Sequence, residues 1–295
     1  MGPSMQRSDL RKPAVAAAAL VGLSACLAGC GDNRTPPPTR AAYEAGAPEA
    51  LPCVPNLDGK IEASELTPQI GIPATYLVSP SGKERTVDVA GAPNAQGQLA
   101  WSLGVDFADD LALTVRASTV EGKWYAASFP QPGAFVAPFD AGGRVEGVYL
   151  HSSERLSLLG LASVAPDVPE GKTLLVYGTP VELYRFPLAP GAEWSSVGEV
   201  RDATLRGLPY AGRDTYEVKV DGAGQLALPD FVLTQALRVR VKVTVAPAAG
   251  QTTTQRQTQF LFECLGEVAR ATSKLDEPQE NFTTALELRR LGLGP

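Results

Sequence analysis

Alternation of apolar and polar residues dominates the chain from about residue 74 onward, and this alternation predicts β-strands. The clearest case is 237–245, where leucine and valines take every second position and Arg238, Arg240 and Lys242 stand between them. Successive side chains of a strand point to opposite faces of its sheet. The segment therefore predicts a strand with one apolar face and one face toward solvent.

Two further segments, 216–221 and 259–264, repeat the alternation, with Gly-rich or Pro-rich breaks between them. Strands this close along the chain usually pair as antiparallel hairpins, so residues 195–290 are expected to form a meander. On its solvent face we expect the basic side chains of 237–245 to lie across from Glu217, Glu263 or Glu267, which steadies the strand register.

The first half of the chain contains shorter strand candidates, separated by breaks rich in Gly, Pro or Asp. They lie at 74–78, 86–89, 99–107, 111–117, 124–129, 147–150, 156–159 and 174–177. Short strands at this spacing are typical of sandwiches and barrels, and a helical period is nearly absent. The predicted fold class is all-β, either an antiparallel β-sandwich or an open half-barrel, with little helix.

The first 30 residues have the organisation of a secretory signal. A positive start with Arg7, Arg11 and Lys12 precedes 14–28, which carries no charge. This apolar stretch is shorter than the roughly 20 residues that a helix needs to cross a bilayer core. The sequence therefore predicts a cleaved signal and not a permanent span.

The signal ends in Leu27-Ala28-Gly29-Cys30, which resembles the bacterial lipobox. The resemblance implies that a diacylglyceryl group is added to the Cys30 thiol and that residues 1–29 are removed as a lipoprotein signal peptide. An ordinary secretory signal or a buried helix is the alternative for this segment. Lipoprotein cysteines carry two or three acyl chains, which is enough for durable anchoring in a membrane.

The residues after Cys30 bear on the location of the anchor. In many Gram-negative bacteria an Asp directly after the lipid-bearing cysteine favours the inner membrane, whereas here Gly31 follows and Asp32 comes one residue later. This order favours the outer membrane over the inner one, with the folded part outside the cytoplasm. The bias toward Ala, Gly, Pro, Leu and Val is similar to that of uncharacterised lipoproteins of myxobacteria, a resemblance that implies no function.

Composition suggests how the mature chain is divided. Residues 30–52 are rich in Pro and Ala and predict a lipidated cysteine followed by a flexible tether. A Pro-rich break near 186–191 separates a first β-rich domain at 53–187 from a meander domain at 188–295, or else two sheets of one domain.

Charge and cysteine count narrow the partners and the compartment. Without residues 1–29 the chain has 23 Lys and Arg against 31 Asp and Glu, a formal charge of −8, which argues against nucleic acid as a partner. Cys53 and Cys264 remain after processing, and outside the cytoplasm they are expected to form a disulfide. Two separate buried thiols are the alternative.

One segment resembles the calcium loop of an EF-hand. With Gly59 as its central glycine, the expected ligands are Asn56, Asp58, the carbonyl of Lys60, Glu62 and a bidentate Glu65. The first ligand position holds Val54 in place of an aspartate, which removes an oxygen and a negative charge. Calcium is therefore the one cofactor that the sequence suggests, and a relic of the loop or a turn that caps a short helix is the alternative.

Catalytic motifs are scarce. His151 is the only histidine, no G-x-S-x-G elbow follows the signal, and the ligands of the usual zinc enzymes are missing. We therefore expect a non-enzymatic lipoprotein that acts as a binding or structural module for an unknown protein or apolar ligand. Two alternatives stay open: a carrier that holds a lipid or other apolar ligand in a half-barrel cavity, and a glycosidase that uses two carboxylates.

Overall fold

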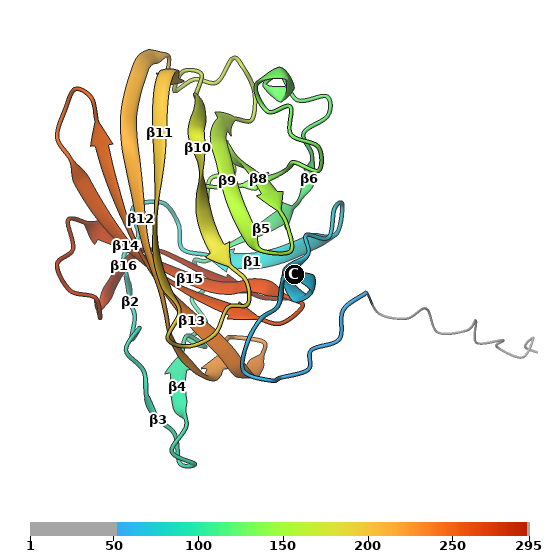
Figure 1. Cartoon of the computed structure of the whole chain (residues 1–295). Coiled ribbons are helices and arrows are strands. Elements are labelled where there is room, and N and C mark those ends of the chain that lie inside the picture. The colour runs from blue at the N-terminus through green and yellow to red at the C-terminus, as the bar shows by residue number, and fades with distance from the viewer. Residues whose placement is uncertain (1–51, 294–295) are drawn as a thin grey trace, which may run out of the picture. The chain divides into compact units, whose positions relative to one another are not determined.

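The computed structural model describes residues 52–293, and it is built almost entirely of β-strands (Figure 1). Two 3-10 turns, η1 (Ala63–Leu66) and η2 (Ala126–Ser128), are its helical elements. The strands are β1 (Pro73–Val78), β2 (Arg85–Thr86), β3 (Ala92–Pro93), β4 (Leu99–Ser102), β5 (Leu111–Arg116), β6 (Ser118–Thr119), β7 (Phe135–Pro138), β8 (Val145–His151), β9 (Arg155–Ser163), β10 (Leu174–Arg185), β11 (Glu193–Leu205), β12 (Leu208–Ala227), β13 (Val232–Pro247), β14 (Thr253–Phe262), β15 (Gly266–Leu275) and β16 (Thr284–Leu291). The prediction of an all-β antiparallel fold with little helix is confirmed.

All the strands belong to one sheet, in which β6 to β16 follow each other in chain order as a long antiparallel meander. The expected meander over 195–290 is the second part of this run. Beyond β16 the sheet continues through β1, with Tyr76 opposite Leu291, and then through β5, with Pro73 opposite Arg116. The two edge strands are therefore β5 and β6.

The sheet curls until these edges meet. β5 ends at Arg116 and β6 begins at Ser118, so one residue, Ala117, joins the two edges. Ala117 also forms an isolated bridge with Ile70, and its carbonyl accepts a hydrogen bond of 2.8 Å from the amide of Gly71. Figure 1 shows the resulting wrap, a nearly closed barrel.

The long strand β12 bends where a second segment crosses it. Its pairing with β13 shifts register between Val220 and Gly222 and again between Gly224 and Leu226. At this bend β4 pairs with β12 in parallel, the one parallel pairing between named strands of the part described. A Cβ on Gly224 would lie 2.0 Å from the carbonyl oxygen of Leu99, so only glycine permits this close approach.

Apolar side chains fill the inside of the barrel and also cover parts of its outside. The inner cluster includes Tyr177, Val218, Val239 and Leu261. Outside β13 to β16, residues 87–103 lie against the sheet, and Trp101 meets Phe260 edge to face at 5.0 Å. Outside β7 to β9, the segment around η2 buries Val120, Tyr125 and Phe129 against Val136 and Val148. Much of the sheet is therefore buried on both faces.

This outer cover overturns part of the prediction for 237–245. Arg238 and Arg240 are each only 7% exposed, so the expectation that they face solvent is wrong. Both donate through Nε to Asp221, at 2.7 and 2.6 Å, and Arg238 also donates to the carbonyl of Val89 in the covering segment. Lys242 does lie on the surface, 2.7 Å from Glu217, one of its three expected partners.

Three of the shorter strand predictions need correction. Residues 124–129 form the 3-10 turn η2 and its flanks, because the amides of Ala126, Ser128 and Phe129 each donate a hydrogen bond to the carbonyl three residues earlier. Tyr125 and Phe129, four residues apart, then lie with their ring centroids 6.0 Å from each other, whereas a strand would hold them about 13 Å apart. The strands expected at 86–89 and 99–107 are shorter, since only Arg85–Thr86 and Leu99–Ser102 pair with neighbours.

The expected division between 187 and 188 falls within one sheet. Both positions lie in the connection between β10 and β11, which are neighbours in the sheet, and the described residues 52–293 form a single compact unit. Leu188, fully buried, belongs to the same cluster as Tyr184 before it and Trp194 after it. The correction is therefore one β-unit in place of two domains.

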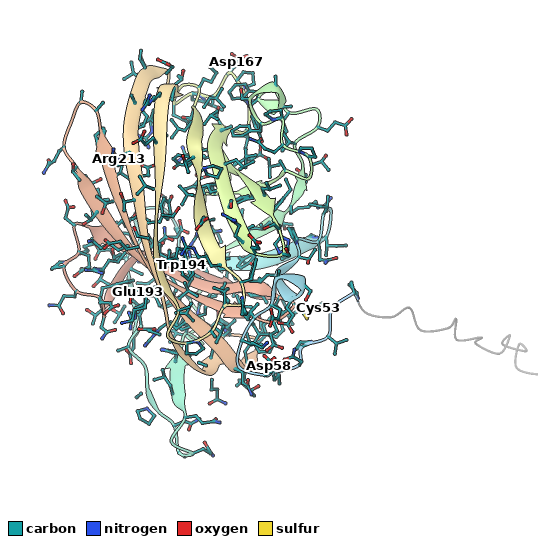
Figure 2. The ribbon with its side chains drawn as sticks, in the orientation of Figure 1. Cys53, Asp58, Asp167, Glu193, Trp194 and Arg213 are labelled. Atoms are coloured by element: carbon teal, nitrogen blue, oxygen red, sulfur yellow. A yellow bond between two sulfur atoms is a disulfide. The ribbon has the colours of Figure 1, made fainter. Side chains whose placement is uncertain are left out.

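The disulfide between Cys53 and Cys264 is present, as expected, with its Cα atoms 5.6 Å apart. Cys264 lies in the turn between β14 and β15, so the bond joins the start of the described chain to this turn. Figure 2 shows Cys53 and Asp58 on the segment that leads to η1. Two backbone hydrogen bonds of 2.8 Å between Ile61 and Leu188 hold that segment further along.

We predict that replacing both cysteines, Cys53→Ser with Cys264→Ser, lowers the free energy of unfolding in urea by about 2–5 kcal/mol, because the bond closes a very long loop of the unfolded chain. The double variant should behave alike with and without a reducing agent, whereas reduction should destabilise the parent protein. Equal stability of variant and parent under oxidising conditions would refute the prediction.

A second prediction concerns Asp214, which is 7% exposed and accepts a hydrogen bond of 2.6 Å from the Tyr177 hydroxyl. Burial raises the pKa of Asp214 above its ordinary value. The folded state therefore favours the protonated acid, and stability is lost as pH rises through the folded-state pKa, whereas below the unfolded pKa of about 3.9 there is no loss.

We expect Asp214→Asn to stabilise the protein near neutral pH and to lose this advantage below pH ~4, the range in which the parent's acid is protonated in both states. Urea unfolding at both pH values measures the difference. The exposed Asp167→Asn is the control and should change stability little at either pH.

Candidate ligand-binding cavity

A cavity of about 310 Å³ lies inside the curled sheet. Its wall is built from β1, β5, β7 to β10 and β12 to β16, together with η1. Because β5 and β7 belong to opposite ends of the sheet and both line the same space, that space is the interior of the barrel.

One side of the cavity is aromatic. Its ring-bearing residues are Tyr76, Phe135, Phe139, Tyr149, Tyr184 and Tyr216, and we call them the aromatic wall. Phe135 and Tyr149 are opposite each other on β7 and β8, and their rings stack with centroids 5.5 Å apart. Cross-strand aromatic pairs of this kind add about 0.5–1.5 kcal/mol beyond the area they bury.

The other side is polar and comes from the last three strands. Gln257 and Gln259 of β14 point inward at alternate positions, and Glu267, Arg270 and Arg289 follow on β15 and β16. These side chains occupy positions where the interior of a small barrel usually carries apolar residues. The cavity is thus amphipathic, with an aromatic wall facing a polar one.

Hydrogen bonds tie the two sides together. The Tyr184 hydroxyl donates to Gln259 Oε1 at 2.8 Å, and Gln259 Nε2 donates to Gln257 Oε1 at 3.1 Å. The Tyr76 hydroxyl donates to the backbone carbonyl of Glu267 at 2.6 Å. These bonds hold the amides and the rings in fixed orientations.

The two arginines of the polar side are held differently. Arg289 donates through Nη2 to Glu287 Oε1 at 3.2 Å. Around Arg270 the nearest carboxylate oxygens lie 3.6 Å from Nε, on Glu267, and 3.7 Å from Nη2, on Glu287. The Nε atoms of both arginines are buried and have no hydrogen-bond partner. The guanidinium of Arg270 is thus paired by charge at a distance and not by hydrogen bonds.

Burial determines the protonation of the phenols. It raises the pKa of Tyr149 to about 12, and it also raises the pKa values of Tyr76, Tyr184 and Tyr216 above the ordinary value. Burial lowers the pKa of Arg289, and the nearby charge of Arg270 lowers it further. At neutral pH the aromatic wall therefore carries neutral hydroxyl groups.

The segment that follows Cys53 closes part of the cavity. Leu66 of η1 and Pro68 after it contribute to the lining. η1 is held in place because the carbonyl of Glu65 accepts a hydrogen bond of 2.9 Å from the amide of Cys264. The N-terminal segment is therefore part of the cavity wall.

The residues of the EF-hand-like segment lie close together but bind each other. Glu65 accepts hydrogen bonds from Asn56 Nδ2 at 2.9 Å and from the amide of Glu62 at 2.8 Å, an arrangement that caps η1. Lys60 Nζ forms an ion pair with Glu62 and lies 3.8 Å from Asp58 Oδ2. Within residues 52–293 no group of three or more His, Cys, Asp or Glu side chains has the geometry of a metal site. Calcium binding stays a prediction that titration calorimetry can test.

The remaining sequence predictions are placed as follows. His151 ends β8 beside Phe186, with ring centroids 5.5 Å apart, and burial lowers its pKa. Cys30, the lipobox and the tether up to residue 51 lie outside the described residues. In the described part, no helix has both the length and the apolar character needed to span a membrane.

The cavity residues were not singled out from the sequence. The alternation at Gln257 and Gln259 is compatible with an inward-facing position. Because both residues are polar, the same alternation also fits the solvent-exposed face of a strand. Comparison of the chain with models of protein families, with curated proteins and with solved structures found no match. The cavity therefore has to be interpreted from its own chemistry.

We predict that Tyr184→Phe destabilises the protein by about 1–3 kcal/mol, because it leaves the buried Gln259 Oε1 without its donor. In the double variant Tyr184→Phe with Gln259→Leu both partners are apolar, so the combined loss should be smaller than the sum of the two single losses. Urea unfolding of the four proteins measures the coupling, and strict additivity would count against a hydrogen bond at this position.

Proposed function

We propose that the protein is a membrane-anchored, extracytoplasmic lipoprotein that acts as a non-enzymatic binding module, and that the cavity of its barrel receives an apolar ligand. The observation that carries the proposal is the cavity itself. A filled core would have left a purely structural module as the better interpretation.

The size and lining of the cavity support a bound ligand. Protein interiors are normally packed without such voids. The cavity is partly open and has polar groups in its wall, so it can exchange water for a ligand. Its volume of about 310 Å³ is near the lower end of the range of ligand pockets, about 300–1,000 Å³. The ligand is therefore a small molecule and not a lipid with two long chains.

The proposed location rests on the sequence and agrees with the disulfide. The resemblance to a lipobox supports an anchor at Cys30, and a bond between Cys53 and Cys264 suits an oxidising compartment. Both features support a folded unit outside the cytoplasm, and the residue order after Cys30 favours the outer membrane.

The acids of the cavity favour binding over hydrolysis. A glycosidase needs two carboxyl groups that face the substrate. Glu267 is the one acid among the residues lining the cavity, and its Oε1 lies 3.6 Å from Arg270 Nε. The wall therefore supplies recognition groups and one paired carboxylate.

We expect decanol, a small apolar probe, to bind the mature protein and to raise its thermal unfolding temperature, because a ligand that binds only the folded state stabilises it. Ala137→Phe places a ring in the cavity and should abolish this shift, whereas Ala249→Phe in an exposed loop should leave it unchanged. If decanol gives no saturable shift with the parent protein, the proposal that the cavity takes an uncharged apolar ligand is refuted.

The anchor is tested separately. Cys30→Ala should leave an unprocessed protein that no longer carries lipid at this position, detected by mass spectrometry and by labelling with a radioactive fatty acid. Cys26→Ala, inside the signal, is the matched control and should be processed normally. If Cys30→Ala still fractionated with membranes at the normal processed mass, the lipoprotein proposal would have to be withdrawn.

A further inference from the structure

Arg270 stands out among the buried arginines because its hydrogen-bonding capacity is unused. Arg290, fully buried on the outer face, leaves its Nε without a partner, but its other nitrogens donate to the carbonyls of Leu103 and Val105 and pair with Asp110. Arg270 has carboxylate oxygens only at 3.6 and 3.7 Å, beyond hydrogen-bond distance. Its donors are thus held close to the cavity without an acceptor.

An unused guanidinium is costly in a barrel interior. Its N–H groups lose water on burial, and the loss is made good only when acceptors replace the water. Arg289, which is 4% exposed and also lines the cavity, has a buried Nε without a partner as well. The polar side therefore presents several N–H donors of positively charged guanidinium groups to the cavity.

The charges that face the cavity select the acceptor. Two arginines and one glutamate line it, and Glu287, 3.2 Å from Arg289 Nη2 and 3.7 Å from Arg270 Nη2, makes the group of four charges neutral. A ligand with one negative charge adds a single charge to this neutral group, whereas a dianion adds two. A carboxylate meets the requirement, and its two oxygens match the paired donors of a guanidinium.

The aromatic wall selects the rest of the ligand. Phe135 and Tyr149 offer stacked rings, and the phenols around them are neutral at physiological pH, so they do not repel an anion. Tyr76 and Tyr184 already donate their single hydroxyl protons within the protein, so the Tyr149 hydroxyl is the one beside the stacked rings that can donate to a carboxylate. An apolar body against the rings and an acid group at Arg270 would occupy both sides of the cavity at once.

We propose, building on the function proposed above, that the ligand is a small monocarboxylic acid whose carboxylate accepts hydrogen bonds from Arg270 and whose apolar body lies against the aromatic wall. Fatty acids of medium length and aromatic acids share this chemistry, and the test below distinguishes them. Arg289 supports the same carboxylate from the neighbouring strand.

The test compares decanoic acid with decanol on the same mature protein at neutral pH by titration calorimetry. The two probes have the same chain, so their difference reports the acid group alone. A charged hydrogen bond of this kind is worth about 1.5–3 kcal/mol, so the acid should bind at least roughly tenfold more tightly than the alcohol. Naphthoic acid and naphthalenemethanol, used in the same way, show whether an aromatic body fits better than an alkyl chain.

The outcomes separate the two proposals. Equal affinities of acid and alcohol in both pairs would overturn the assignment of a carboxylate ligand and leave the apolar cavity standing. Failure of all four probes to bind would overturn the ligand-binding function itself. Tighter binding of an acid than of the alcohol with the same apolar body supports the assignment. The acid that binds more tightly then identifies that body as an alkyl chain or an aromatic ring.

A variant locates the acid group. Arg270→Gln removes the charge and shortens the side chain, so the ratio of decanoic acid affinity to decanol affinity should fall toward one. Arg201→Gln, whose parent side chain is 82% exposed, is the matched control and should keep the full preference. A folded Arg270→Gln protein with an undiminished preference for the acid would overturn the role of Arg270. If this variant fails to fold, the comparison of acid with alcohol on the parent protein still decides the ligand class.

Discussion

One covalent constraint shapes the whole unit: the two edges of the sheet are joined through Ala117 alone. A twisted sheet whose first and last strands must meet within a single residue cannot stay open, so it wraps around an interior. The wrap leaves little free edge for pairing with other chains, since the edge strands lie beside each other. It also creates the space in which side chains from β1, β5 and β14 to β16 face those from β7 to β10.

The cover on the outside of the barrel explains why several arginines of the sheet are buried. Residues 87–103 and the segment around η2 cover the sheet from outside, so several strands are buried on both faces. Arg238, Arg240 and Arg290 are buried on this outer face, and each finds carbonyl or carboxylate acceptors there. Arg238 donates to Val89 and Asp221, Arg240 to Asp221 and the carbonyl of Glu280, and Arg290 to the carbonyl of Leu103. Neighbouring positions on the inner face, above all Arg270, lack such acceptors. The contrast between the faces is the physical basis for assigning a ligand to the inner one.

How far the sequence predicts this structure depends on how far apart along the chain the interacting residues lie. The all-β class, the meander after residue 195 and the Cys53–Cys264 disulfide follow from alternation, chain spacing and cysteine count, and the structure confirms them. The burial of Arg238 does not follow, because its cover comes from Val89, about 150 residues earlier in the chain, and alternation within one strand cannot show a distant cover. Gln257 and Gln259 were missed for a related reason: polar residues on an alternating strand look the same whether they face solvent or a cavity.

The position of the disulfide has a mechanical consequence. In the proposed lipoprotein the chain is anchored ahead of residue 53, so it would be pulled whenever the anchor and the folded part move apart. With Cys53 bonded to Cys264, that force passes directly into the turn between β14 and β15. Residues 54–68, including η1 and the part of the wall formed by Leu66, come after this attachment and are relieved of tension. Reduction of the bond would route the same force through η1, so the redox state of one cystine would decide whether stretching the tether deforms the cavity.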